Sequence, residues 1–115
     1  MKTPSPINRS RSAELFEAAK EYFPGGVNSP VRAFKSVGGT PLFIAKGDGA
    51  KIWDEDCNEF IDFCCSWGPL IHGHNHTYVF EKIVATLSNG ASFGAPTKKE
   101  NELAAFMLER LPFID

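Results

Sequence analysis

The sequence predicts an α+β arrangement in which an N-terminal helix precedes a three-stranded antiparallel sheet and two further helices. Two periodicities support this order. Apolar residues recur at helical spacing over 15–23 and again after 77, whereas 42–64 holds three short apolar runs separated by turn residues. The 115 residues are 43% hydrophobic and 23% charged, which suits one small domain with a modest core.

The first helix is expected to follow a flexible tail formed by residues 1–9, which are polar and proline-rich. Ser10 or Ser12 can cap the helix with its hydroxyl. Pro24-Gly25-Gly26 is expected to end the helix. Its apolar face consists of Leu15, Phe16, Ala18, Ala19, Tyr22 and Phe23.

The sheet is expected to be a meander with short loops, which is stable only when one face is covered. Its strands are predicted at 42–45, 51–54 and 60–64, with turns at Gly47-Asp48-Gly49 and 55–58. Residues 66–76 are rich in glycine, histidine and aromatic residues, and are expected to be irregular.

Two amphipathic helices are expected after residue 77. The first has an apolar stripe over 79–87 and ends at Asn89-Gly90. In the second, Thr97 and Glu100 have the spacing of a capping box, and Pro112 is expected to close the helix.

The segment 25–34 places one arginine on what is expected to be a short, stiff, extended stretch. Pro30 fixes its own φ and favours extended geometry at Ser29. An arginine held in this way can grip a carboxylate with two parallel hydrogen bonds, and a nearby serine hydroxyl can complete the clamp. On spacing alone, an ordinary surface role for Arg32 is favoured over a carboxylate-binding role.

Composition excludes several classes of function. A net charge of −2 gives no basic surface for nucleic acid, and we expect no nucleic-acid partner. No apolar run approaches the roughly 20 residues of a membrane span, and the first residues lack a signal-peptide pattern. A cytoplasmic setting without membrane contact is therefore expected.

The three cysteines do not suggest a disulfide framework, because their number is odd and two are adjacent. Cys64 and Cys65 are expected to be small buried residues. The alternation of His72, His74 and His76 resembles a metal-binding pattern, but no fourth ligand accompanies it, and we expect no metal site.

Trp67 follows the end of the third predicted strand and precedes a glycine. A tryptophan is usually a core residue, but the neighbouring glycine leaves its ring accessible, which favours a pocket.

Four motifs together carry a resemblance to a known family. They are Asn28-Ser29-Pro30-Val31-Arg32, Phe63-Cys64-Cys65-Ser66-Trp67-Gly68-Pro69-Leu70, Gly73-His74-Asn75-His76 and Ser92-Phe93-Gly94-Ala95-Pro96-Thr97. With these motifs the chain resembles the glutamate-1-semialdehyde 2,1-aminomutase family of class III pyridoxal-phosphate-dependent aminotransferases, from about Asn8 onward. Three positions depart from the family pattern: Cys57 replaces a usual glycine, His72 an apolar residue and Thr77 a proline.

The resemblance implies that residues 10–115 are the N-terminal segment of an aspartate-aminotransferase-type α/β fold, normally a homodimer. It places Ser29, Arg32 and Trp67 at the substrate site. The lysine that bonds pyridoxal 5'-phosphate, the aspartate facing the pyridine nitrogen and the phosphate-binding loop belong to a large domain outside these residues. We therefore expect no catalytic or cofactor-binding residue in this chain.

The implied activity is an isomerase reaction on a small molecule, the conversion of (S)-4-amino-5-oxopentanoate to 5-aminolevulinate in tetrapyrrole biosynthesis. The chain alone is expected to be inactive. Two alternatives stay open: another class III aminotransferase of the ornithine type, and a truncated product without catalysis.

Overall fold

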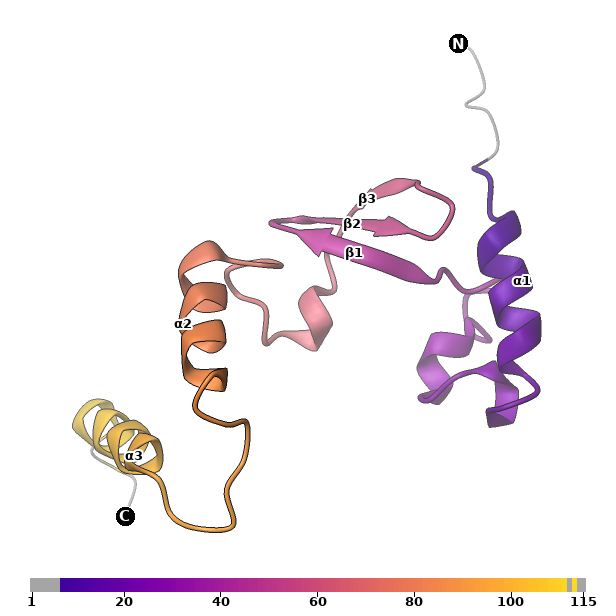
Figure 1. The fold of residues 1–115 in the computed structure, drawn as a ribbon. Helices are drawn as coiled ribbons and strands as arrows, with labels where there is room; N and C mark the ends of the chain where they lie inside the picture. The colour runs from indigo at the N-terminus through magenta and orange to yellow at the C-terminus, as the bar shows by residue number, and fades with distance from the viewer. Residues whose placement is uncertain (1–6, 112, 114–115) are drawn as a thin grey trace. The chain divides into compact units, whose positions relative to one another are not determined.

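The computed structural model describes residues 7–111 and residue 113. The chain divides into two compact units, Met1–Thr77 and Tyr78–Asp115. The first contains one α-helix, the sheet and the irregular segments, and the second contains two α-helices (Figure 1). This confirms the predicted order of helix, three strands and two helices.

Helix α1 spans Ser10–Ala19 and is followed by two short 3-10 helices, η1 (Pro24–Gly26) and η2 (Pro30–Ala33). The sequence predicted that this helix would end at Pro24, but α1 ends at Ala19. After Ala19 the chain continues in isolated turns, in which the amides of Tyr22 and Phe23 donate to the carbonyl of Ala19. Pro24 therefore begins a separate turn rather than ending the helix.

The sheet has the order β1-β2-β3, with β1 at Ile44–Asp48, β2 at Lys51–Asp54 and β3 at Glu59–Ile61, all antiparallel. The second strand matches the prediction. The first begins and ends later than predicted, so that Gly47 and Asp48 lie in the strand and the turn consists of Gly49 and Ala50. The third stops at Ile61, because the Asp62 carboxylate then accepts hydrogen bonds from the amides of Cys64 and Cys65 and turns the chain.

The cap of α1 comes from the sheet and not from the predicted Ser10 or Ser12. Asp56, in the turn between β2 and β3, accepts hydrogen bonds from the amides of Arg11 and Ser12 at 2.8 and 2.9 Å. The Ser10 amide donates instead to the side chain of Asn8. Asn8, at the end of the predicted tail, is thus bonded within the first unit, and residues 1–6 lie outside the described part.

The best-buried side chains of the first unit are polar. Asp54 and Ser12 are fully buried, with relative exposures of 1% and 0%. Asp54 accepts bonds from the amides of Asp56 and Asn58 and from the Asn58 side chain, so it organises the β2–β3 turn. The Ser12 hydroxyl accepts a bond from the Phe43 amide. A network of hydrogen bonds therefore joins α1 to the sheet.

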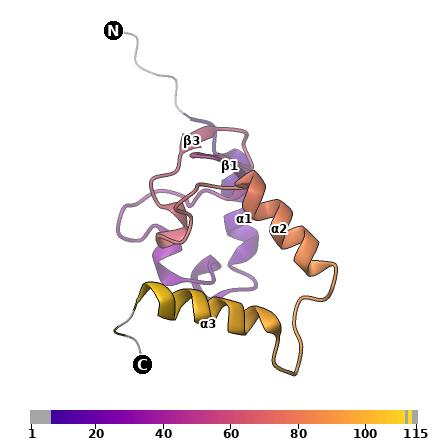
Figure 2. The same cartoon turned by 90° about the vertical axis from the view of Figure 1, so that its left-hand side faces the viewer.

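The second unit contains α2 (Thr77–Leu87, which begins at the unit boundary) and α3 (Lys98–Arg110; Figure 2). Neither helix has a buried residue. Thr97 is the N-cap residue of α3, as predicted, but its side chain makes no capping hydrogen bond, so the predicted capping box is not formed. The predicted closure at Pro112 lies outside the described residues.

Two further observations concern the described residues. None of their helices is long and apolar enough to cross a membrane. All three cysteines are free, and Cys64 is exposed while Cys65 is half-buried. The expectation that both would be buried is wrong, because the chain has already left the strand at Asp62.

Candidate functional site

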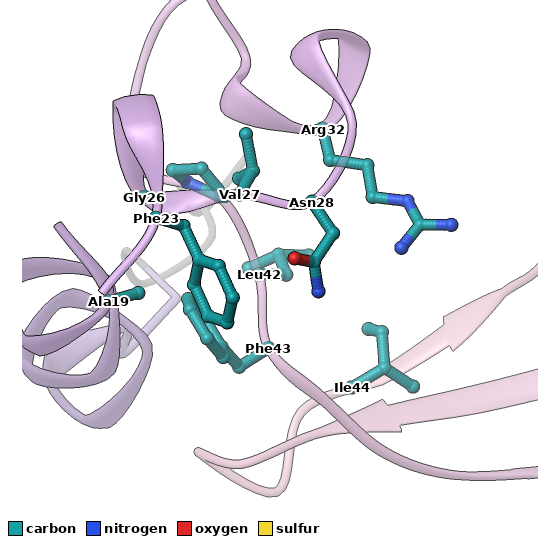
Figure 3. A pocket seen from close by; sticks show the side chains of 10 residues that line it. Ala19, Phe23, Gly26, Val27, Asn28, Arg32, Leu42, Phe43 and Ile44 are labelled. Carbon is teal, nitrogen blue, oxygen red and sulfur yellow. The ribbon is translucent and has the colours of Figure 1, made fainter.

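A cavity of about 390 Å³ lies between the segment after α1 and the start of β1 (Figure 3). Its wall is mostly apolar and consists of Ala19, Phe23, Gly26, Val27, Pro41, Leu42, Phe43 and Ile44. The polar side chains that line it are those of Asn28 and Arg32. An apolar cavity with few polar groups is the usual form of a small-molecule site.

Arg32 reaches this cavity from η2 and not from an extended stretch. Ser29 has the predicted extended geometry, with φ −144° and ψ 129°, but Pro30 then starts a 3-10 turn in which the Arg32 amide donates to the Ser29 carbonyl at 3.0 Å. The proline φ suits the first residue of a helix as well as an extended chain. The extended prediction therefore holds for Ser29 and is wrong for Arg32.

The Arg32 guanidinium is exposed and projects past the cavity wall (Figure 3). Within the part of the chain that the structure describes, no acidic side chain forms an ion pair with it. The guanidinium can therefore offer its parallel N–H donors to a carboxylate ligand.

Ser29 does not line this cavity, whereas its neighbour Asn28 does. The backbone angles on either side of Asn28, at Val27 and Ser29, are extended. Sequence reasoning missed Asn28.

Trp67 lies in η3 (Cys65–Trp67) and is 72% exposed. It does not line the cavity of Arg32, and the structure does not join these two predicted residues in one pocket. Cys65, Ser66 and Trp67 all have positive φ values, of 47°, 55° and 65°. Each left-handed non-glycine residue costs about 1–2 kcal/mol.

The loop that carries Trp67 is held by an acid–histidine contact that sequence reasoning missed. His74 Nε2 lies 2.7 Å from Asp62 Oδ2. The hydrogen bond from His74, followed by that from the Cys64 amide, holds the pKa of Asp62 below its ordinary value. In the described part of the chain, no three His, Cys, Asp or Glu side chains gather to hold a metal ion.

The described lysines do not fit the covalent attachment of a cofactor. A lysine that forms a Schiff base is normally desolvated in a pocket. Every lysine in the described range is exposed. Lys20 and Lys51 pair with Glu17 and Glu59, and Lys46 lies 4.5 Å from the centre of the Trp53 ring.

The fold and the chain's motifs define a class of protein. The class-III aminotransferase family model matches residues 34–114, and the chain belongs to this family. At the level of a particular protein, the chain is 57% identical over 109 residues to the glutamate-1-semialdehyde 2,1-aminomutase of Syntrophomonas wolfei, which confirms the resemblance seen in the sequence. The match covers 95% of this chain and 25% of that relative, so the chain spans about a quarter of the curated relatives' length.

Solved structures agree on the fold. An omega-transaminase from Sphaerobacter thermophilus matches 90% of this chain and 23% of its own, with a TM-score of 0.80 and 37% identity. A glutamate-1-semialdehyde aminomutase from Pseudomonas aeruginosa matches 89% of this chain and 22% of its own, with a TM-score of 0.78. At 22% identity, the second match supports the fold alone. The chain is thus a segment of the aminotransferase fold, as the sequence predicted.

Proposed function

We propose that the protein containing this chain is a pyridoxal-phosphate-dependent glutamate-1-semialdehyde 2,1-aminomutase. It would isomerise (S)-4-amino-5-oxopentanoate to 5-aminolevulinate for tetrapyrrole biosynthesis. The observation that carries the proposal is the 57% identity to the Syntrophomonas wolfei aminomutase over 95% of this chain. That alignment is long enough to include the Asn28–Arg32 motif, which the resemblance assigns to aminomutases.

The cofactor, when bound, supplies the transfer of the amino group, and residues outside this chain would hold it. The role proposed for this segment is to bind and orient the substrate. Arg32 would bind the substrate carboxylate as a planar fork, because its guanidinium is exposed at the edge of a cavity and forms no ion pair with an acidic side chain among the described residues. Ser29 and Trp67 are proposed as further substrate contacts from the resemblance.

Kinetics of the full-length protein test the role of Arg32. Lysine keeps the charge but loses the second parallel hydrogen bond, so Arg32→Lys should weaken substrate binding and Arg32→Ala should weaken it further. A charge-assisted bond is worth about 1.5–3 kcal/mol, or roughly ten- to a hundred-fold in affinity. A simple amine without a carboxylate serves as the control substrate and should react unchanged. Equal losses with both substrates would show that Arg32 is structural.

A second candidate is another class III aminotransferase, for example one of the ornithine type. The observation in its favour is the 37% identity to an omega-transaminase of known structure, against 22% to the aminomutase of known structure. The two functions differ in products. The aminomutase converts its substrate without a second amino acceptor, whereas a transaminase needs one. Formation of 5-aminolevulinate without an added acceptor supports the first proposal, and a strict need for an acceptor supports the second.

We propose further that the full-length protein is a cytoplasmic homodimer, and that this chain alone has no activity. Inactivity of the chain alone is also what we would expect if the chain were a truncated product without catalysis. Incubation of the 115-residue chain with pyridoxal phosphate should leave no cofactor absorbance after dialysis, since its described lysines are exposed. A stoichiometric adduct on one lysine would contradict this.

A further inference from the structure

Two residues near the two ends of the loop between β3 and α2, Asp62 and His74, are in contact with each other. The loop leaves the sheet at Asp62, passes through η3 and returns to the β1–β2 hairpin at His74 (Figure 1). The Asp62 carboxylate and the His74 ring meet at 2.7 Å, with side-chain exposures of 9% and 23%. A contact between residues 12 apart thus closes this loop at its base.

Both residues of the contact are held by other bonds. The other oxygen of Asp62 accepts from the amides of Cys64 and Cys65, at 2.8 and 3.2 Å. The backbone of His74 exchanges two hydrogen bonds with Gly49, at 2.9 and 2.8 Å. The imidazole also lies against Gly47 so closely that a Cβ there would meet the ring at 2.6 Å. The base of the loop is therefore fixed to β3 on one side and to the hairpin on the other.

The apex of the loop is the strained turn that carries Trp67. Three consecutive non-glycine residues, Cys65 to Trp67, have left-handed backbones, and Gly68 follows with φ 111°. Such a run persists only where surrounding contacts over-determine it. Trp67 itself is 72% exposed, so its own packing within this chain does not supply those contacts. The two amide bonds to Asp62 come from Cys64, directly before the strained run, and from Cys65, its first residue, and can supply such contacts.

We propose that Asp62 and His74 form a clamp that holds the Trp67 turn in its left-handed conformation. Asp62 fixes the entrance to the turn, and His74 fixes Asp62 by joining it to the hairpin. Insofar as Trp67 contacts substrate, which rests on the proposed function, Asp62 and His74 are positioning residues for that site.

The clamp is tested first by a measurement that does not depend on activity. The full-length protein is labelled with 5-fluorotryptophan, and its ¹⁹F NMR lines for Trp67 and Trp53 are assigned by Trp67→Phe and Trp53→Phe. Asp62→Ala, which removes all three bonds, should shift or broaden the Trp67 line and leave the Trp53 line in place. Asp62→Asn keeps an oxygen that can accept from the two amides, so its Trp67 line should lie closer to the wild-type position than that of Asp62→Ala.

Two further variants separate the clamp from general damage. Gly47→Ala displaces the His74 ring from the hairpin side without changing Asp62 or Trp67, and should move the Trp67 line in the same direction as Asp62→Ala. Glu59→Gln removes a carboxylate from the exposed Lys51–Glu59 pair of the same sheet, and should leave the Trp67 line unchanged. An unmoved Trp67 line in both Asp62→Ala and Gly47→Ala would overturn the clamp.

Kinetics then test positioning by a double-mutant cycle. Asp62→Ala and Trp67→Ala should each lower kcat/KM, on the order of 10- to 100-fold, because a misplaced contact of about 1 Å can cost about 100-fold. The double variant should lose no more than Trp67→Ala alone, and losses that multiply would overturn the positioning role. If Trp67→Ala and Arg32→Ala both leave kcat/KM intact, the proposed substrate site is wrong, and the NMR lines still decide the clamp.

Discussion

The two units of this chain are held by different kinds of bond. In the first, hydrogen bonds join residues far apart in the sequence: the Arg11 and Ser12 amides donate to Asp56 across 45 and 44 positions. In the second, the side-chain bonds of the described residues span four positions or fewer, as in Lys99–Glu102 and Arg110–Phe106. One unit is thus organised by tertiary contacts and the other by local ones.

This difference shows that a helix can be specified by its sequence without being stabilised by its surroundings. The apolar positions of α2 and α3 follow helical spacing, yet Ile83, Leu87 and Leu103 are 50%, 51% and 60% exposed. Helices of 11 and 13 residues are marginal in water on propensity alone. Within this chain, the first unit should therefore be the more stable of the two.

The largest expected effect is a difference in amide hydrogen exchange between the two units of the 115-residue chain. Amides paired in the β1–β2 and β2–β3 ladders should be protected, whereas those of α2 and α3 should exchange on the order of 10- to 100-fold faster. The reason is that opening either helix breaks local bonds only. Equal protection of both units, measured by NMR on a monomeric sample, would contradict the comparison.

Removing the long-range cap should destabilise the first unit more than any local change. Asp56→Asn takes the negative charge from the N-terminus of α1, where amides and the helix dipole favour it. Thermal unfolding followed by circular dichroism should show a lower Tm at pH 7. Asp48→Asn, which changes an exposed carboxylate of the same sheet, is the matched control and should have little effect.

The same cap should make stability depend on pH. Partial burial would raise the pKa of Asp56, but hydrogen bonds from the Arg11 and Ser12 amides and the serine hydroxyls outweigh it and lower the pKa in the folded state. A depressed carboxyl pKa contributes stability that is present above the unfolded-state pKa, about 4. This contribution is lost as the pH falls through the lower folded-state pKa. The Tm difference between wild type and Asp56→Asn should therefore shrink below about pH 4, and a constant difference would contradict this origin.

A smaller effect is expected at the turn that carries Asp56. Cys57 has φ 65°, the left-handed geometry anticipated where the family pattern has glycine. Cys57→Gly should stabilise the first unit by up to about 1 kcal/mol, because glycine adopts this backbone without a Cβ penalty. Cys64→Gly is the control. The φ of Cys64 is −85°, so glycine removes no strain there and should lower the free energy of unfolding. Urea unfolding measures both, and loss of stability in Cys57→Gly would contradict the strain.

The sequence predicted what depends on neighbours and missed what depends on distant contacts. The element order and β2 followed from periodicity, which is local. The Asp56 cap was missed because its partners lie 44 and 45 positions away. The turn at Arg32 was misjudged because the fixed φ of Pro30 suits both geometries. Asn28 and the Asp62–His74 contact could be found only once the chain's path was known, since nothing in their spacing marks them.

The smallest effect on stability is expected at the start of α3. Its N-cap residue is Thr97, whose side chain forms no capping hydrogen bond. Thr97 has an extended backbone, with φ −123° and ψ 152°. A capping threonine normally contributes about 1 kcal/mol, so Thr97→Ala should cost clearly less, within roughly 0.3 kcal/mol.

Exchange rates of the first α3 amides are the right measurement, because global unfolding reports mainly on the first unit. Thr97→Asp is the informative counterpart: its carboxylate can accept those amides and should slow their exchange. A loss near 1 kcal/mol in Thr97→Ala would mean that the hydroxyl caps the helix in solution, and the contrast between a distant cap on α1 and none on α3 would then be wrong.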